Sequence, residues 1–426
     1  MNADSRKVQR IYLTLMLFHT LAASFIWGIN TLFLLDAGLS NAQAFAANAF
    51  FTAGLVLFEV PTGVVADTRG RRTSYLLGTL TLAASTLLYL WMWRISAPFW
   101  AWALASALLG LGFTFFSGAV EAWLVDALAF TGFDGKLESV FAKGEIVQGI
   151  AMLGGSVAGG AIAQATNLGV PYVLRTAVLG VTFVLAFLWM RDLGFAPSRG
   201  KQPLSEVKRV LRGSLDHGLA NPPVRWVMLA APFTDGVIIY AFYAMQPYLL
   251  ELYGDERAYG VAGLAAAIVA GAQIIGGLLV PYIGRMFQRR TSVLLAGTLA
   301  SCAILATIGF LPSFWLVLVL LVLWGLMFAA IMPVRQAYLN GLVASGQRAT
   351  VLSFDSLLGS SGGMVFQPIL GRAADAWSYP ASYAGSAAIQ ALALPFLWLA
   401  RRERAPSDPM PADTERPPAS RSMGRG

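Results

Sequence analysis

Long apolar segments separated by short polar ones run through the whole of this 426-residue sequence. A helix that crosses the hydrocarbon core of a bilayer needs about 20 mostly apolar residues. Charged residues and clusters of Gly, Pro or Asn divide the sequence into twelve segments of about that length or more, at 11–35, 43–66, 73–94, 98–128, 137–165, 171–191, 223–251, 259–285, 291–311, 313–342, 348–374 and 379–401. The pattern predicts an all-α integral membrane protein with twelve transmembrane helices.

Composition excludes a soluble protein. Apolar residues make up 57% of the chain and charged residues only 12%, whereas soluble domains average about 45–50% and about 25%. The single cysteine, Cys302, and the two histidines leave no disulfide framework and no thiolate zinc cluster. No phosphate-binding GxxxxGK[ST], zinc-binding HExxH or nucleophile GxSxG motif is present. We therefore expect no enzymatic activity, no cofactor and no metal site.

Basic residues alternate between the two sides of the membrane in the way that twelve spans require. The loops on one side contain few basic residues beyond Arg94 and Arg257, while those on the other side are rich in them. Because cytoplasmic loops carry an excess of Lys and Arg, the richer side is predicted to be cytoplasmic, together with both termini. The net charge of +8 then marks membrane topology in a multi-pass cell-membrane protein, and no nucleic-acid partner is expected. The basic residues on the richer side are Arg6, Lys7, Arg10, Arg69, Arg71, Arg72, Lys136, Arg191, Arg199, Lys201, Lys208, Arg209, Arg212, Arg225, Arg285, Arg289, Arg290, Arg348 and the arginines from Arg401 onward.

The chain divides into two similar halves. We expect an N-terminal six-helix bundle at 1–191, a cytoplasmic linker at 192–222, a C-terminal six-helix bundle at 223–401 and a disordered tail at 402–426, which is rich in Pro, Ser and charge. The segment from Phe99 aligns without gaps with the segment from Phe314. Repeats with an even number of spans are related by an axis along the membrane normal, and such repeats place a substrate site between the halves near the midplane.

A charged turn follows the second span. It reads GVVADTRGRR and contains Gly63, Asp67, Gly70, Arg71 and Arg72. Gly70 permits a tight turn. Asp126 closes the fourth span on the same side, so an ion pair with the first of the two arginines would latch two helices together at the cytoplasmic end. The alternative is that these residues are ordinary positive-inside charges.

This turn resembles the signature between helices 2 and 3 of the major facilitator superfamily. The segments EVPTGVVAD from Glu59, AWLVDAL from Ala122 and RATVLS from Arg348 resemble its drug:proton antiporter branch. The resemblance implies alternating access by two rocking bundles, with helices 1, 4, 7 and 10 lining the cavity. It also implies a conformational charge network of Asp67, Arg71 and Asp126.

Two features depart from that branch. The helix 5 antiporter motif GxxxGPxxGG appears here as AMLGGSVAGG, which keeps Gly155, Gly159 and Gly160 but has Ala151 and Ser156 in place of Gly and Pro. The small residues still permit close helix packing. The arginine expected within helix 4 of many proton antiporters is absent, since that span has no basic residue.

Ionisable residues at membrane depth are candidates for function because burying them is costly. Asp235 lies ten residues beyond Arg225, or roughly 15 Å into the bilayer, and is our first candidate for proton or cation binding. The alternative is that it stabilises a helix distorted near Pro232. Glu121 and Arg335 occupy nearly equivalent repeat positions and would pair across the cavity, either as a permanent strut or as a switching contact.

Aromatic and amide side chains on the expected cavity helices are candidates for substrate contact. They would hold an amphiphilic, weakly polar molecule, although each is alternatively a packing or lipid-facing residue. The candidates are Trp27, Asn30, Phe116, Tyr240, Tyr243 and Gln246.

These observations together predict a monomeric secondary transporter in the lipid bilayer. We expect proton-coupled efflux of small hydrophobic or amphiphilic substrates, with the proton as coupling ion. The alternatives are uptake of a neutral metabolite by proton symport or uniport and, in another class, a transport-inactive membrane sensor.

Overall fold

A computed structural model describes residues 3–197, 212, 218–344 and 347–410 of the chain, and its regular structure is helical. The predicted linker at 192–222 and tail at 402–426 therefore fall largely outside the described residues. The N-terminal half contains α1 (Ala3–Trp27), α2 (Asn30–Asp36), α3 (Asn41–Arg69), α4 (Arg71–Ile95), α5 (Phe99–Thr114), α6 (Ala119–Phe130), α7 (Leu137–Ala165) and α8 (Gly169–Trp189). The C-terminal half contains α10 (Pro222–Tyr253), α11 (Tyr259–Gly277), α12 (Val280–Met286), α13 (Arg290–Phe310), α14 (Phe314–Asn340), α15 (Arg348–Ala376), α16 (Tyr379–Ala391) and α17 (Ala393–Arg402).

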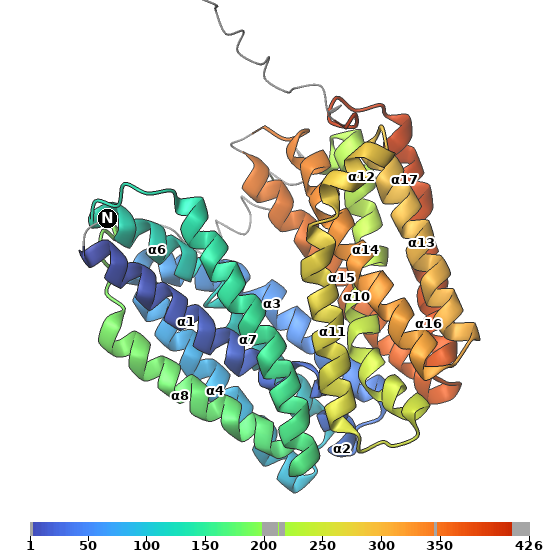
Figure 1. Cartoon of the computed structure of the whole chain (residues 1–426), viewed down its shortest axis with the longest axis horizontal. Helices are drawn as coiled ribbons and strands as arrows, with labels where there is room; N and C mark the ends of the chain where they lie inside the picture. The colour runs from blue at the N-terminus through green and yellow to red at the C-terminus, as the bar shows by residue number, and fades with distance from the viewer. Residues whose placement is uncertain (1–2, 198–211, 213–217, 345–346, 411–426) are drawn as a thin grey trace, which may run out of the picture.

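The helices form two bundles that stand side by side, one from each half of the sequence (Figure 1). Within the described residues, eleven helical segments are long and apolar enough to cross a membrane. The predicted span that is not among these eleven is the one at 348–374, which is α15. Its polar residues include Asp355 and Gln367, both buried. This helix packs against α10 of its own bundle and α3 of the other, so its polar side chains lie inside the protein. The prediction of an all-α membrane protein with two pseudo-symmetric bundles is confirmed.

Four of the predicted spans are divided into two helices each, namely α1/α2, α5/α6, α11/α12 and α16/α17. The break between α5 and α6 ends at Gly118, whose φ of +65° is a left-handed conformation that glycine adopts without steric cost. Broken helices are tolerated inside membranes where neighbouring protein groups satisfy the freed backbone atoms. At two of the breaks a side chain from another helix meets a backbone group: Gln246 at α1/α2, and Ser74, whose hydroxyl donates to the carbonyl of Phe115 at α5/α6.

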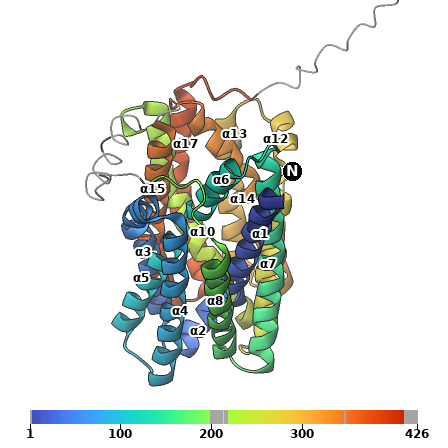
Figure 2. The same ribbon diagram turned by 90° about the vertical axis from the view of Figure 1, so that its left-hand side faces the viewer.

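The two ends of the molecule differ in charge. The start of α1 and the end of α8 lie at the left of Figure 1, and the start of α13 and the end of α17 lie at its top. The turn between α3 and α4 lies beside the segment after α8. Because these segments carry most of the basic residues, we call this the basic end; it is the upper end in Figure 2. The opposite end, where α2, the end of α10 and the start of α11 meet, we call the far end. The bundles pack against each other through α3 with α15 and α7 with α11.

Part of the predicted disordered tail is ordered and docks on the C-terminal bundle. Ser407 donates from Oγ to the carbonyl of Tyr338 at 2.8 Å, and the amide of Met410 donates to the carbonyl of Gln288 at 3.0 Å. Arg290 donates to the carbonyl of Ser407. Tyr338 and Ser407 lie 69 residues apart in the sequence, a separation that composition alone does not reveal. Residues 402–410 thus belong to the folded bundle, and the rest of the predicted tail lies beyond the described part of the chain.

Candidate functional site

A glutamine of α10 joins the two bundles at the break between α1 and α2. The amide nitrogen of Gln246 donates to the carbonyl of Trp27 at 2.8 Å, and its amide oxygen accepts from the backbone N–H of Thr31 at 3.0 Å. Helix ends leave such backbone groups without intrahelical partners. One buried side chain from the C-terminal bundle therefore satisfies both sides of a helix break in the N-terminal bundle. Gln246 was predicted to contact substrate. In the structure its side chain instead hydrogen-bonds across the two bundles and closes the far end.

A second contact closes the far end beside it. Asp375, near the end of α15, accepts from the backbone amides of Asn41 and Ala42 at 2.9 and 2.8 Å. The hydroxyl of Tyr379 donates to the side-chain oxygen of Asn41 at 2.5 Å. A carboxylate at the start of α3 is favourable because it meets unpaired N–H groups and the positive end of the helix dipole. Asp375 was not among the predicted site residues, although an acidic residue at the end of a span was a signal for it.

The small residues of α7 allow close helix packing, with two different partners. Gly155 and Gly159 lie against α1, where an added Cβ would strike Ser24 and the carbonyl of Phe25. Gly160 lies against α11, where a Cβ would be 2.7 Å from the carbonyl oxygen of Tyr259 and 2.8 Å from the Cα of Gly263. The last of these glycines therefore lets the two bundles approach each other.

At the basic end, the predicted latch has different partners in the structure. Arg71 pairs with Asp67, four residues earlier, at 2.5 Å, and among the described residues no ion pair joins Arg71 to Asp126. Gly70 has a φ of +104°, as the tight turn requires, while Gly63 has open space around its Cα. The backbone N–H of Arg72 donates to Asp192 at 2.9 Å. The contact that ties α4 to the segment after α8 is therefore made by Asp192, which was not among the predicted site residues.

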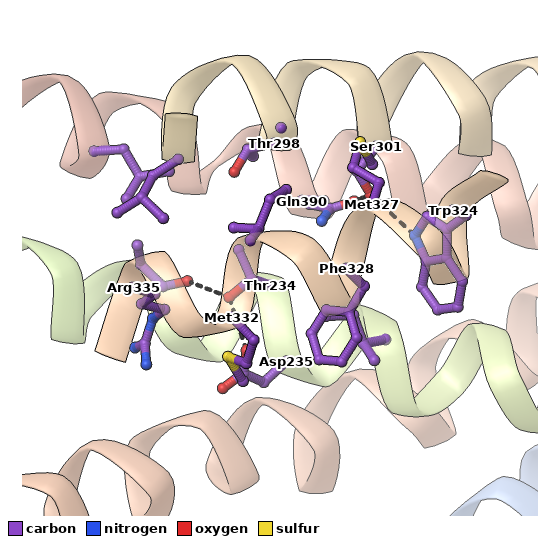
Figure 3. Close-up of a pocket in the computed structure, with 16 residues that line it drawn as sticks. Thr234, Asp235, Thr298, Ser301, Trp324, Met327, Phe328, Met332, Arg335 and Gln390 are labelled. Carbon is purple, nitrogen blue, oxygen red and sulfur yellow. Dashed lines mark hydrogen bonds between the residues drawn. The ribbon is translucent and has the colours of Figure 1, made fainter. Parts of the chain in front are cut away.

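Asp235 lines a small cavity within the C-terminal bundle (Figure 3). The cavity has a volume of about 60 Å³, room for a few water molecules. Thr234 donates to the Asp235 carboxylate at 3.0 Å, and Gly359 of α15 faces the same carboxylate. Most of the wall is apolar; polar groups come from Thr234, Asp235, Thr298, Ser301, Arg335 and Gln390.

Arg335 also lines this cavity, but its partner differs from the one expected. Its guanidinium makes two hydrogen bonds to Asp355 of α15, at 2.5 and 2.7 Å, with both side chains largely buried. The predicted Glu121–Arg335 pair is therefore wrong for this structure. Glu121 lies on α6 in the other bundle, and its buried oxygen Oε2 has no hydrogen-bond partner among the described residues. Asp235, Arg335 and Asp355 thus form one cluster of charged residues in the C-terminal bundle, in which Arg335 is paired with Asp355 and shares a cavity with Asp235.

The N-terminal bundle contains a buried arginine that was not among the predicted site residues. Arg175 of α8 is 2% exposed, donates from Nε to Thr86 at 3.1 Å and lies over the ring of Phe113. With the repeat offset of 215, the positions of Thr86 and Arg175 correspond to those of Ser301 and Gln390, which are hydrogen-bonded at 2.8 Å. The signal was a lone basic residue in an apolar span.

The remaining candidates contribute to packing. Asn30 links the hydroxyl of Tyr172 to the side chain of Asn48, with bonds of 3.0 and 3.1 Å. Tyr240 is fully buried, and its hydroxyl contacts Ser382 at 2.6 Å. Phe116 packs on His19 with ring centres 4.2 Å apart, while Trp27 packs on Phe242 at 5.7 Å. The carbonyl of Tyr243 accepts from Thr31 at 3.0 Å in the far-end contact.

Comparison with known proteins decides the family. The family model described as Major Facilitator Superfamily matches residues 12–288 and 257–423. The chain belongs to this superfamily. Members of the Major Facilitator Superfamily are non-enzymatic carriers, so the chain is a multi-pass membrane transporter of small molecules.

Its similar relatives include proteins named for drug resistance. The chain is 25% identical over 350 residues to "Multidrug resistance protein MdtG" from Salmonella choleraesuis strain SC-B67, which covers 80% of this chain and 81% of that protein. The protein of the same name from Salmonella typhi is also 25% identical over 350 residues.

Solved structures share the fold of this superfamily member. The nucleoside transporter NupG superposes with a TM-score of 0.74 and 11% identity, covering 93% of this chain and 99% of that one. A bacterial homologue of the human lysosomal transporter Spinster, in an inward-facing and unoccupied conformation, gives a TM-score of 0.74 and 15% identity, covering 97% of this chain and 100% of that one. At these identities the likeness shows the fold alone.

Proposed function

We propose that this transporter exports small hydrophobic or amphiphilic compounds in exchange for protons. The observation that carries the proposal is the placement of Asp235 in a mostly apolar cavity beside Arg335, which is already paired with Asp355. A carboxylate is acceptor-only when ionised and gains a donor when protonated, so a change at Asp235 changes both charge and hydrogen bonding in the cavity. The relatives named for multidrug resistance support the substrate class.

The proposed orientation places the basic end in the cytoplasm. Lys and Arg gather at that end of both bundles, as the positive-inside rule requires of cytoplasmic loops. The contacts of Gln246 and Asp375 then close the outer end. Among the described residues, the hydrogen bonds between the bundles lie at the far end, so we assign this conformation to the inward-facing state of the transport cycle.

The proposed coupling is competition within the C-terminal bundle. Arg335 has two acidic neighbours, Asp355, which it binds directly, and Asp235, which lines the same cavity. An ionised Asp235 competes with Asp355 for the guanidinium, while a protonated one leaves the Arg335–Asp355 pair intact. Because α15 also packs on α3 of the other bundle, a change in this pair reaches the interface between the bundles. Protonation would thereby be linked to the conformational change and to substrate release.

Proteoliposomes that contain the purified transporter and a fluorescent lipophilic dye test this proposal. Wild-type protein should move the dye in response to an imposed pH difference. Asp235→Asn should lose that response while retaining dye exchange without a gradient, and Asp134→Asn, a change in an exposed loop, should behave like wild type. Full pH-driven transport by Asp235→Asn would overturn the coupling role. If the same proteoliposomes accumulated a neutral nucleoside in response to the pH difference and did not move the dye, the export proposal would be overturned.

A further inference from the structure

A groove lies on the outer surface of the N-terminal bundle at its far end, between the end of α4 and the start of α8. Its volume is about 660 Å³, and it is open to the surroundings of the bundle. We propose that this groove binds the head group of an anionic phospholipid, with the lipid phosphate at Arg94 and an acyl chain along the apolar wall. The residues used in the argument are Trp91, Trp93, Arg94, Asn167, Gly169 and Val173.

The floor of the groove is held in place by two contacts. The indole N–H of Trp93 donates to the carboxylate of Asp36 at 2.8 Å. The ring lies against Gly169, where an added Cβ would come within 2.5 Å of the ring. A side chain at this position would displace the indole, so glycine leaves room for it. The site is therefore formed before any ligand arrives, and the nearby Asp36 carboxylate is engaged with Trp93.

Arg94 supplies the positive charge. It is exposed, and within the described parts of the chain its guanidinium has no ion pair and no hydrogen bond. Asn167 accepts from the N–H of Gly169 through its side-chain oxygen at 2.9 Å, which leaves its amide nitrogen as a donor. The start of α8 adds the positive end of a helix dipole. No acidic residue lines the groove, so an anion is the complementary ligand.

The position of Arg94 is unusual for a membrane protein of this kind. Loops at the far end carry few basic residues; Arg257, in the loop before α11, is another. A phosphate group at the membrane surface gives Arg94 a charge-assisted partner. Lipid binding would thus explain why a basic residue lies at the far end, where the positive-inside rule does not call for one.

The apolar part of the groove favours a lipid over a soluble anion. Trp91 is 59% exposed and Val173 is 53% exposed, and both lie on helices that cross the bilayer. Tryptophan is enriched where a transmembrane helix meets the head groups. Charge at one end and exposed apolar side chains at the other match an amphiphile with an anionic head and a hydrocarbon tail.

Native mass spectrometry of the purified full chain in detergent tests the assignment. The probes are dioleoyl phosphatidylglycerol, dioleoyl phosphatidylcholine and inorganic phosphate, each added separately. Wild-type protein should retain phosphatidylglycerol in preference to both other probes. Arg94→Gln should bind it about tenfold more weakly, since a charge-assisted contact is lost. Arg257→Gln is the matched control because it removes an exposed arginine at the same end of the other bundle, and it should bind like wild type.

A second variant tests the apolar wall without changing any charge. Val173→Trp fills the groove from an exposed position and should also weaken phosphatidylglycerol binding. Equal retention of phosphatidylglycerol by wild type and Arg94→Gln would overturn the proposal. So would equal losses in Arg94→Gln and Arg257→Gln, which would indicate non-specific charge attraction. Equal binding of phosphatidylcholine, or binding of inorganic phosphate alone, would also overturn it.

Discussion

Asp192 and Asp408 hold equivalent helices in the two bundles. Asp192 follows α8 and accepts from the N–H of Arg72, the second residue of α4, at 2.9 Å. Asp408 follows α17 and accepts from the N–H of Thr291, the second residue of α13, at 2.9 Å. The two aspartates are 216 residues apart, close to the offset of the sequence repeat. In each bundle the segment after the sixth span is thus fastened to the start of the third.

Asp408→Ala should destabilise the C-terminal bundle. Losing a side chain that caps a helix start costs about 0.5–2 kcal/mol, and Asp408 is buried. Asp192→Ala should have an effect of the same sign in the N-terminal bundle. The midpoint of thermal unfolding in detergent measures both effects, with Asp134→Ala, an exposed loop aspartate, as the control. Unchanged midpoints for both variants would show that these caps contribute nothing to stability.

Replacing one member of the Arg335–Asp355 pair should be more harmful than replacing both. Breaking a buried pair leaves an uncompensated charge, at a cost of about 3–5 kcal/mol, whereas apolar replacement of both partners is often neutral. We expect Arg335→Met and Asp355→Leu each to lower the unfolding midpoint and the double variant to recover most of the loss. Proton-driven transport should be absent in all three. Additive losses in the double variant would argue against direct coupling of these side chains.

Gln246→Ala should weaken the far-end closure. The backbone groups of Trp27 and Thr31 lose their partners, so the conformation open at the far end should become more populated. Opening can be measured with the variant Ala262→Cys in a Cys302→Ser background. Ala262 is 1% exposed and lies beside Gly28 of the other bundle, so a cysteine there becomes accessible only when the far end opens. Its labelling by a thiol reagent should become several-fold faster. Gln9→Ala removes another buried glutamine, one near the start of α1 and outside the Asp235 cavity, and should leave the labelling rate unchanged.

Gly160→Ala should favour the same opening by a steric route. The added methyl group would lie 2.7 Å from the carbonyl oxygen of Tyr259 in α11, so the two bundles can no longer pack as closely. Gly154→Ala places a methyl group on the same helix where no atom lies within 4 Å. We expect faster labelling of the cysteine at position 262 for the first variant alone. Equal labelling of the two variants would contradict a role for close packing at Gly160.

The helices and their grouping were predictable because they follow from local hydropathy and from the repeat. The span boundaries agree with the helices to within a few residues at most ends, and the predicted tight turn at Gly70 has a positive φ of +104°, which glycine tolerates. These features depend on the bilayer as solvent and on short stretches of chain. The span boundaries and the turn do not depend on how each helix is rotated about its own axis, so they can be predicted without knowing which helices pack together.

The partners of individual charges were not predictable for that same reason. Arg335 was assigned to Glu121 from repeat symmetry, yet α15 presents Asp355 at a closer position in the same bundle. Arg71 was assigned to Asp126 because both lie on one side of the membrane, and a residue one turn earlier, Asp67, is nearer. Sequence gives the depth of a residue in the membrane, whereas its rotation about the helix axis depends on packing between distant segments.

Two distances measured in one protein test alternating access most directly. Cys302 is the only cysteine, so a Cys302→Ser background accepts pairs of spin labels at exposed positions. Lys136→Cys with Gln288→Cys reports the basic end, and Thr166→Cys with Asp255→Cys reports the far end. The distances are measured by double electron–electron resonance spectroscopy on the spin-labelled transporter in nanodiscs, with and without saturating dye. Adding the dye should shorten the distance between the labels at the basic end and lengthen the distance between those at the far end. Distances that stay fixed, or change in the same direction, in protein that still transports would contradict the account.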